Sequence, residues 1–224
     1  MDARPLPLFP LNHVLLPFMP LPLHVFEQRY RQMLRDLTEH SDGLGSFGVV
    51  ALQRGWEAGE TTRTPEVAPI GTVAEILEID ANPDGTFQVL AVGSRRFRIA
   101  DVVAGAAPYL QASVSYLDEP IGRTNPALEA LTRRLMTRFD AALMERTGRA
   151  TGGELPTDPG ELSYHLAARL PLGPVERQLL LAEPDAGSRL RRLVHLLRRE
   201  VSLLRNTGSI AVSPSVLRMS VVPN

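Results

Sequence analysis

The side chains that most often carry out chemistry in proteins are thinly spread along this chain of 224 residues. No two of its histidines are four residues apart, the spacing that places two imidazoles on one helix face to hold a metal ion. The five are His13, His24, His40, His165 and His195. Glu57 and Glu60, beside Trp56, are the nearest approach to an acid pair, but no base or nucleophile accompanies them. These patterns predict no catalytic centre and no metal or cofactor site.

The basic residues are all of one type, because the sequence contains 24 arginines and no lysine. A phosphate-binding loop of the form GxxxxGK[ST] needs its lysine, and a serine–lysine peptidase needs a lysine base. Arginine cannot act as that base, since a pKa above about 12 keeps it protonated. The absence of cysteine also excludes disulfides and thiol chemistry.

One cluster of arginines surrounds an aromatic residue. Arg95, Arg96 and Arg98 flank Phe97, a combination that single-stranded nucleic acid binders use for charge and base stacking. Strand alternation places Phe97 on the face opposite Arg96 and Arg98. We therefore expect a buried ring between two solvated arginines.

A second group of arginines lies near the C-terminus, in a segment whose only acidic residue is Glu200. The group comprises Arg189, Arg191, Arg192, Arg198, Arg199 and Arg205. A positive stripe of this kind could bind an acidic partner or RNA, whereas the alternative is a helix whose leucines pack and whose arginines are solvated. The net charge of -1 argues against a general nucleic-acid-binding protein.

Large apolar side chains occur at two places that are predicted to be loops. Phe18 and Met19 stand between Pro17 and Pro20, and Trp56 is the only tryptophan of the chain. Exposed aromatic and methionine side chains suit the capture of unfolded apolar segments with little sequence demand. Burial of the same residues in the core is the alternative.

Prolines divide the first part of the chain into short apolar segments. They are Pro5, Pro7, Pro10, Pro17, Pro20 and Pro22. Proline interrupts helices and is tolerated in sheets mainly in edge strands, so we expect short edge strands and corners of a small barrel. A helical period follows, with an apolar face formed by Phe26, Tyr30, Met33, Leu34 and Leu37. Gln28, Arg29 and Gln32 occupy the polar face of this helix.

The middle of the chain reads as antiparallel strands, and the last part reads as helices. The strands are predicted at Phe47–Leu52, Gly71–Asp80, Thr86–Val92, Arg96–Ile99 and Gln111–Leu117, with a bulge or corner at Gly93. Asn125 and Pro126 are expected to begin a helix that ends by Gly148. Further helices are predicted at Glu161–Leu170, Val175–Ala182 and Ala186–Leu204. We divide the chain into residues 1–118, 124–205 and a tail, 206–224.

Several segments resemble those of one known family in their amino-acid sequence and in their order along the chain. They are PLHVFEQRYR (22–31), GTVAEILEI (71–79), VLAVGSRRFRI (89–99) and PYLQASVSYL (108–117), followed by Leu162, Ser163, Tyr164, Arg177, Gln178, Asp185, Arg189 and Leu190. The chain thereby resembles the N-terminal substrate-binding domain of the ATP-dependent Lon protease. The resemblance implies an α+β fold, in which a PUA-like antiparallel β pseudo-barrel with one amphipathic helix precedes an α-helical subdomain. In the resembled domain, the positions of Gln28, Arg29 and Gln32 border the substrate-contacting surface.

The motor and peptidase of Lon both depend on lysine, so we expect a stand-alone, non-enzymatic relative of the recognition domain. Its expected function is recognition of unfolded or hydrophobic polypeptide segments, as an adaptor in protein quality control that works with a protease or chaperone. The predicted binding residues are Phe18, Met19, Gln28, Arg29, Gln32 and Trp56. An RNA-binding PUA-like module and a small-ligand pocket in the barrel are the alternatives. We expect a cytoplasmic protein, because no signal peptide or membrane span is apparent, and the oligomeric state stays open.

Overall fold

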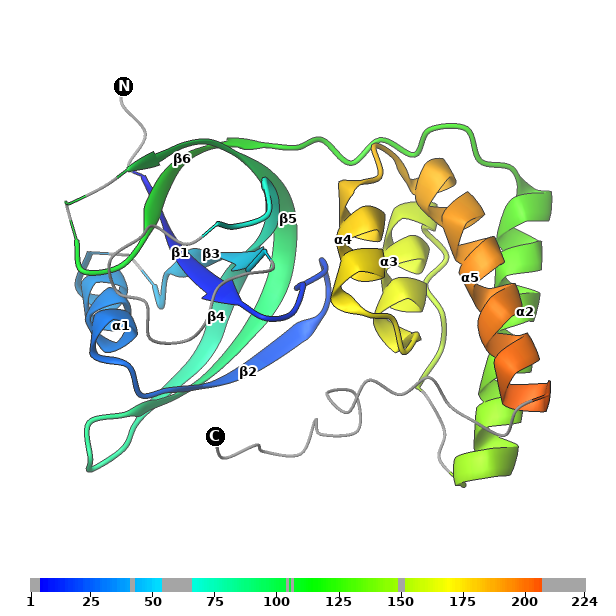
Figure 1. Ribbon diagram of the computed structural model, residues 1–224, viewed down its shortest axis with the longest axis horizontal. Helices are drawn as coiled ribbons and strands as arrows, with labels where there is room; N and C mark the ends of the chain where they lie inside the picture. The colour runs from blue at the N-terminus through cyan, green and yellow to red at the C-terminus, as the bar shows by residue number, and fades with distance from the viewer. Residues whose placement is uncertain are drawn as a thin grey trace. The chain divides into compact units, whose positions relative to one another are not determined.

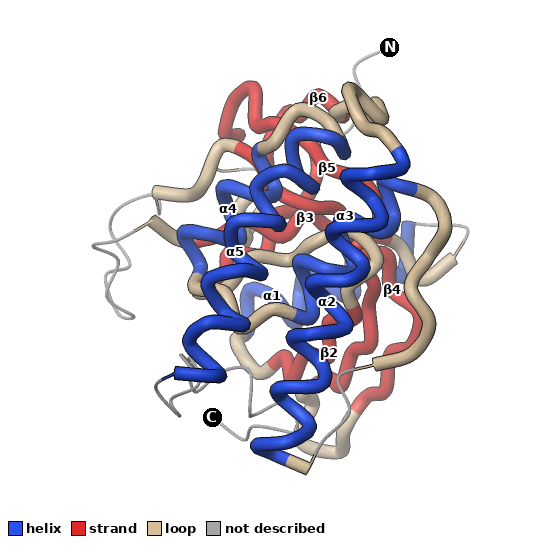
Figure 2. Tube along the Cα trace, turned by 90° about the vertical axis from the view of Figure 1, so that its right-hand side faces the viewer, coloured by secondary structure: helices blue, strands red, loops and turns tan. Residues whose placement is uncertain are grey.

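The computed structural model describes residues 5–40, 43–53, 66–103, 105, 107–148 and 152–206. The chain divides into two compact units, Met1–Asp118 and Glu119–Asn224. The described part of the first unit contains all the strands and one helix, and that of the second contains four helices (Figures 1 and 2). None of the helices in these ranges is long and apolar enough to cross a membrane.

The secondary-structure elements follow one another in a simple order. In the first unit they are β1 (Leu6–Leu11), β2 (Pro20–Val25), α1 (Gln28–His40), β3 (Ser46–Ala51), β4 (Ile70–Ala81), β5 (Phe87–Val103) and β6 (Gln111–Tyr116). In the second unit they are α2 (Pro126–Thr147), α3 (Pro159–Arg169), α4 (Pro174–Ala182) and α5 (Ala186–Asn206). The α+β class predicted from the sequence is confirmed.

The strands form a closed ring because β5 takes part in two walls. The sheet order is β2-β5-β4-β3-β1-β6, with a further pairing between β5 and β6. One edge of β5 pairs with β4, while its other edge pairs first with β2 and then with β6 (Figure 1). The sequence predicted two strands here, but β5 is one strand of 17 residues. The irregularity expected at Gly93 is present as a shift in the β4–β5 register between Thr72 and Ala74.

Strand β1 was predicted to be an edge strand, but it lies between β6 and β3 and runs parallel to β3. Its pairing is staggered, with residues 6–7 on β6 and residues 8–11 on β3. Alternate residues direct their backbone groups to opposite sides, and Leu8 donates its N–H to the residue preceding β6 (2.7 Å). The nitrogen of Pro10 therefore points to the β6 side, where β1 is no longer paired with β6. The nitrogen of Pro7 points to the β3 side, where the pairing with β3 has not yet begun. Neither proline removes a hydrogen bond that the sheet needs.

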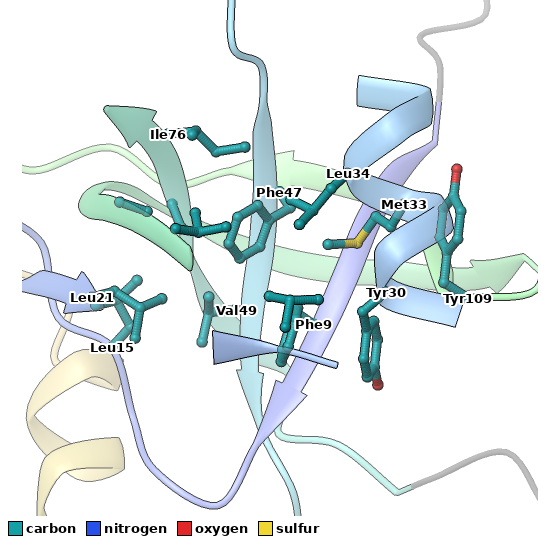
Figure 3. Close-up of a cluster of buried hydrophobic side chains, with 14 residues drawn as sticks. Phe9, Leu15, Leu21, Tyr30, Met33, Leu34, Phe47, Val49, Ile76 and Tyr109 are labelled. Carbon is teal, nitrogen blue, oxygen red and sulfur yellow. The ribbon is translucent and has the colours of Figure 1, made fainter. Parts of the chain in front are cut away.

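Helix α1 packs its apolar face on a cluster of buried side chains from the strands (Figure 3). Tyr30, Met33 and Leu34 come from the helix, and the Tyr30 ring stacks on Phe9 with the centroids 4.1 Å apart. Burial raises the pKa of the Tyr30 hydroxyl to about 12. The hydroxyl of Tyr109 donates a hydrogen bond to Asp36 (2.8 Å) and so ties the segment before β6 to α1. The amphipathic helix predicted from the sequence thus covers the strands as expected.

A second apolar cluster gathers around Phe97, which is fully buried as predicted. Its ring lies against two glycines, one on β3 and one on β4. A Cβ atom at Gly48 or Gly71 would come within 2.7 Å or 2.6 Å of the ring carbon Cζ. The ring therefore fits only because both positions lack a side chain.

In the second unit, the caps predicted from the sequence begin and end α2. The Asn125 side chain accepts a hydrogen bond from the Leu128 N–H (2.8 Å), and Pro126 occupies the first helical turn. Gly148 ends the helix with a left-handed φ of 66°. The aspartate at 158 caps α3 in the same way, by accepting from the Glu161 N–H (2.9 Å).

Candidate binding surface

The turn between β1 and β2 holds Phe18 in an unusual backbone conformation. Met19 donates its N–H to the Leu16 carbonyl (3.2 Å), Pro17 takes the second position of the turn, and Phe18 takes the third with φ 64°. This is the pattern of a type II turn, in which glycine is usual at the third position. Phe18 is the one non-glycine residue with positive φ in the described ranges. For an L-residue, that conformation costs roughly 1–2 kcal/mol.

Gly93 of β5 anchors this turn on both sides of the Phe18–Met19 peptide. Phe18 donates its N–H to the Gly93 carbonyl (2.8 Å), and Gly93 donates its N–H to the Met19 carbonyl (2.9 Å). A Cβ atom at Gly93 would lie 2.2 Å from the Leu16 oxygen, so the close approach requires glycine. The side chain of Phe18 is nevertheless 46% exposed. A strained, anchored backbone that presents an aromatic ring to solvent motivates a binding hypothesis.

Strand β2 continues from this turn and presents alternate residues to solvent. Pro20, Pro22 and His24 are exposed, whereas the alternate residues Leu21 and Val25 are buried and Leu23 is half-buried. Among the described strands β2 pairs only with β5, through an unbroken run of residue pairs. The prolines must therefore direct their nitrogen atoms to the open edge, because they have no N–H for the ladder. This edge therefore lacks, at both prolines, the N–H donors that would favour the addition of a further strand.

Phe26 was predicted on the buried face of the first helix, and this prediction was wrong. Helix α1 begins only at Gln28, and Phe26 continues the alternation of β2, so its side chain is 54% exposed. Its ring lies beside that of His24, with the centroids 6.1 Å apart. His24 is hydrogen-bonded across the strands to Gln88 (2.9 Å).

We call Phe18, Pro20, Pro22 and Phe26 the β2 surface. Sequence reasoning singled out Phe18 but missed the other three. The signal that could have found them is a period of two, since an apolar residue stands at every second position except His24.

The three predicted site residues on α1 differ in their exposure to solvent. Gln28 and Arg29 are exposed near Phe26, with Arg29 paired to Glu27 (2.7 Å). Gln32 is half-buried and donates its amide N–H to Asp36 (2.7 Å), so the helix itself uses this group.

Met19 and Trp56 complete the predicted set. Met19 is half-buried and packs against the cluster under α1, which makes it partly a core residue. Trp56 lies outside the described residues.

The prediction that the two arginines beside Phe97 are solvated is confirmed for one of them and wrong for the other. Arg98 is exposed, but Arg96 is buried opposite Thr72 of β4 and donates to the Asp118 carbonyl (3.1 Å). The strand is buried on both faces at this point, so alternation does not bring Arg96 to solvent. Arg95 is exposed and lies over the Tyr116 ring, 3.6 Å from its centroid.

The expected arginine stripe of α5 is also interrupted by neighbouring elements. Arg192 forms an ion pair with Glu183, and Arg199 pairs with both Glu176 and Glu200. These acidic partners come partly from α4 and the residue after it, so counting charges along α5 alone missed them. Arg189 is fully buried and belongs to no surface stripe.

Arg189 instead joins a buried polar network inside the second unit. Its Nε donates to Ser163 of α3 (2.7 Å), and its Nη2 donates to Glu119 (3.3 Å). The Tyr164 hydroxyl donates to the same carboxylate (2.8 Å). Ser163, Tyr164 and Arg189 are among the residues that carried the resemblance, and here they hold the helices together. In the described part of the chain, no three His, Asp or Glu side chains gather as a metal site.

Comparisons with known proteins agree with the geometry. The family model described as the ATP-dependent protease La (LON) substrate-binding domain matches residues 5–199. Lon protease 2 of Syntrophobacter fumaroxidans is 32% identical over 199 residues, which cover 86% of this chain and 24% of that protein. Lon protease of Escherichia coli K12 is 27% identical over 207 residues, covering 89% and 25%. The chain thus spans about a quarter of the length of these relatives.

Solved structures show the same likeness. The crystal structure of a Lon N-terminal domain protein from Xanthomonas campestris has a TM-score of 0.64 and 28% identity, covering 86% of this chain and 98% of that one. The N-terminal domain of the Mycobacterium avium complex Lon protease has a TM-score of 0.60 at 20% identity, covering 87% and 98%, which shows a shared fold. The matched part is the substrate-binding domain and not the ATPase or protease part. The resemblance is therefore confirmed, and this chain belongs to the family of the Lon substrate-binding domain.

Proposed function

We propose that this chain recognises unfolded or hydrophobic polypeptide segments in the cytoplasm and carries out no catalysis itself. One observation carries the proposal: the β2 surface presents four exposed apolar side chains along a strand whose open edge lacks donors at both prolines. Membership of the Lon substrate-binding family supports it. A protease is the partner that we propose for handing on the bound polypeptide, because the relatives are Lon proteases.

The dimensions of the β2 surface suit a short extended segment. Phe18 and Phe26 lie at opposite ends of a six-residue strand, which spans roughly 20 Å at about 3.3 Å per residue. Covering the exposed half of each ring would contribute roughly 2–3 kcal/mol at about 25 cal/mol per Å2. Part of that gain is offset by the ordering of a flexible partner. Affinity should therefore be modest and sequence demand low.

The proposal is tested by fluorescence anisotropy with a labelled, unstructured peptide rich in leucine and phenylalanine. Phe26→Ala should weaken binding several-fold and leave the melting temperature unchanged, because the side chain is more than half exposed. Leu77→Ala is the matched control, since Leu77 is 53% exposed on β4 but lies outside the β2 surface. Equal losses in both variants, or none in a double Phe18→Asn, Phe26→Ala variant that melts normally, would remove the proposed site.

The alternative of an RNA-binding module finds little support in the arginines that suggested it. Arg96 and Arg189 are buried, and Arg192 and Arg199 are paired with carboxylates. A nucleic-acid-binding domain usually has a basic overall charge, whereas the net charge of this chain is -1.

A further inference from the structure

Helices α2 and α5 of the second unit lie side by side (Figure 2). The side chains of the two helices leave a groove between them. It has a volume of about 370 Å3 and is lined by Leu131, Leu135, Arg138, Arg198, Val201, Ser202 and Arg205. Leu135 and Val201 are buried and form the floor, whereas the three arginines are exposed at the rim. The groove therefore combines an apolar base with a positively charged border.

These three arginines differ from the other cations of α5. Arg192 and Arg199 have carboxylate partners, but Arg138, Arg198 and Arg205 have none within the described ranges. No acidic residue stands three or four positions away on either helix. Three positive charges thus converge on one apolar groove without neutralisation.

We propose that this groove binds an acidic, leucine-bearing amphipathic segment of another polypeptide. Arg198 and Arg205 are seven residues apart, which is two helical turns or about 10.5 Å along α5. Val201 lies between them on the same side. A partner helix with carboxylates two turns apart and leucines between them would match both the charges and the floor.

Two other occupants fit the groove less well. Residues 207–224 of this chain contain Arg218 and no aspartate or glutamate, so their charge is not complementary. A nucleic acid backbone would meet the arginines but leave Leu135 and Val201 without an apolar partner.

The test uses two labelled peptides of about four helical turns, roughly 15 residues, and the full chain. One peptide carries leucines on one face with glutamates two turns apart, and the other carries arginines in place of the glutamates. The acidic peptide should bind and the basic peptide should not. Arg138→Gln, Arg198→Gln and Arg205→Gln should each weaken binding by roughly two- to fivefold, as for exposed ion pairs, and added salt should do the same.

Arg134→Gln is the matched control, because Arg134 is exposed on α2 but does not line the groove. It should bind the acidic peptide like the unmodified chain. Phe26→Ala should also leave this binding intact, so failure here and failure of the β2 surface are distinguishable. Equal binding of both peptides would overturn the proposal, as would loss of binding in Arg134→Gln alone. Tighter binding of single-stranded RNA, or salt-sensitive self-association, would overturn it if the three substitutions abolished either.

Discussion

The guanidinium carbon of Arg189 lies 3.7 Å from the centroid of the Tyr164 ring. Both side chains are buried, and Glu119 accepts hydrogen bonds from both. A cation over an aromatic face gains more when water is excluded, and the carboxylate offsets its charge. Because Glu119 precedes α2, Tyr164 belongs to α3 and Arg189 belongs to α5, this contact joins three parts of the second unit.

Arg189→Ala should therefore destabilise the second unit severely. The change removes the cation that lies over the Tyr164 ring and faces the Glu119 carboxylate. Removing one member of a fully buried ion pair costs roughly 3–5 kcal/mol, and we expect a loss toward the lower end because the Glu119 side chain is 35% exposed. Denaturant unfolding followed by circular dichroism measures the loss. Arg192→Ala is the control, because that exposed pair with Glu183 should contribute less than about 1 kcal/mol. Equal stability of the two variants would contradict a structural role for Arg189.

Substitutions at Phe18 should separate backbone strain from the side chain. Phe18→Gly removes the penalty of the left-handed conformation, whereas Phe18→Ala retains it. The glycine variant should be more stable than the alanine variant by roughly 1 kcal/mol, although both lose the ring and should bind the apolar peptide more weakly. Thermal unfolding of the pair provides the comparison. An alanine variant as stable as the glycine variant would show that the turn is not strained.

A methyl group at position 71 should be poorly tolerated in the first unit. The Cβ atom of Gly71→Ala would lie 2.4 Å from the Val49 oxygen and 2.6 Å from the Phe97 ring, and backbone cannot move aside easily. We expect a loss of roughly 1–3 kcal/mol or more from overpacking, measured by chemical denaturation. Gly173→Ala is the control, because no atom lies within 4 Å of its added Cβ. A Gly71→Ala variant as stable as this control would mean that Phe97 can shift.

The stability of the second unit should decline in acid through Glu176. Hydrogen bonds from the Arg199 side chain hold the pKa of the Glu176 carboxyl below its ordinary value of 4.5. A depressed pKa in the folded state means that the contribution is complete above 4.5 and is lost as the pH falls through the lowered value. Melting temperatures recorded from about pH 7 to about pH 3 should fall less steeply for Glu176→Gln. Identical profiles would show that this pair does not contribute.

Local signals in the sequence were reliable where the cause is local. Asn125 and Gly148 mark the ends of α2 because caps act within one turn, and Phe97 follows the strand alternation. The start of α1 was misjudged because Phe26 fits both a helical and a strand period. Its exposure depends on where the helix begins.

Features that depend on contacts between distant parts of the chain could not be predicted from such local signals. Arg189 was placed on the surface because its carboxylate partner lies 70 residues away in the chain. The parallel pairing of β1 with β3 likewise produces no recognisable pattern in the sequence of either strand. For the candidate site, the sequence indicated the apolar turn at Phe18, but the exposure of Pro20 and Pro22 depends on the pairing of β2 with β5.

Closure of the ring through β1 and β6 has a consequence for how the first unit acquires its fold. Leu6 pairs with Ala112, so the two strands that complete the ring are more than a hundred residues apart in the chain. During synthesis from the N-terminus, β1 has no partner on that side until β6 has emerged. Long loops must therefore close before those contacts form, which places refolding in the slow, millisecond-to-second range of non-local β proteins. Until then apolar residues of the strands stay exposed, so the incompletely folded first unit is open to aggregation for longer than a domain of mostly local contacts.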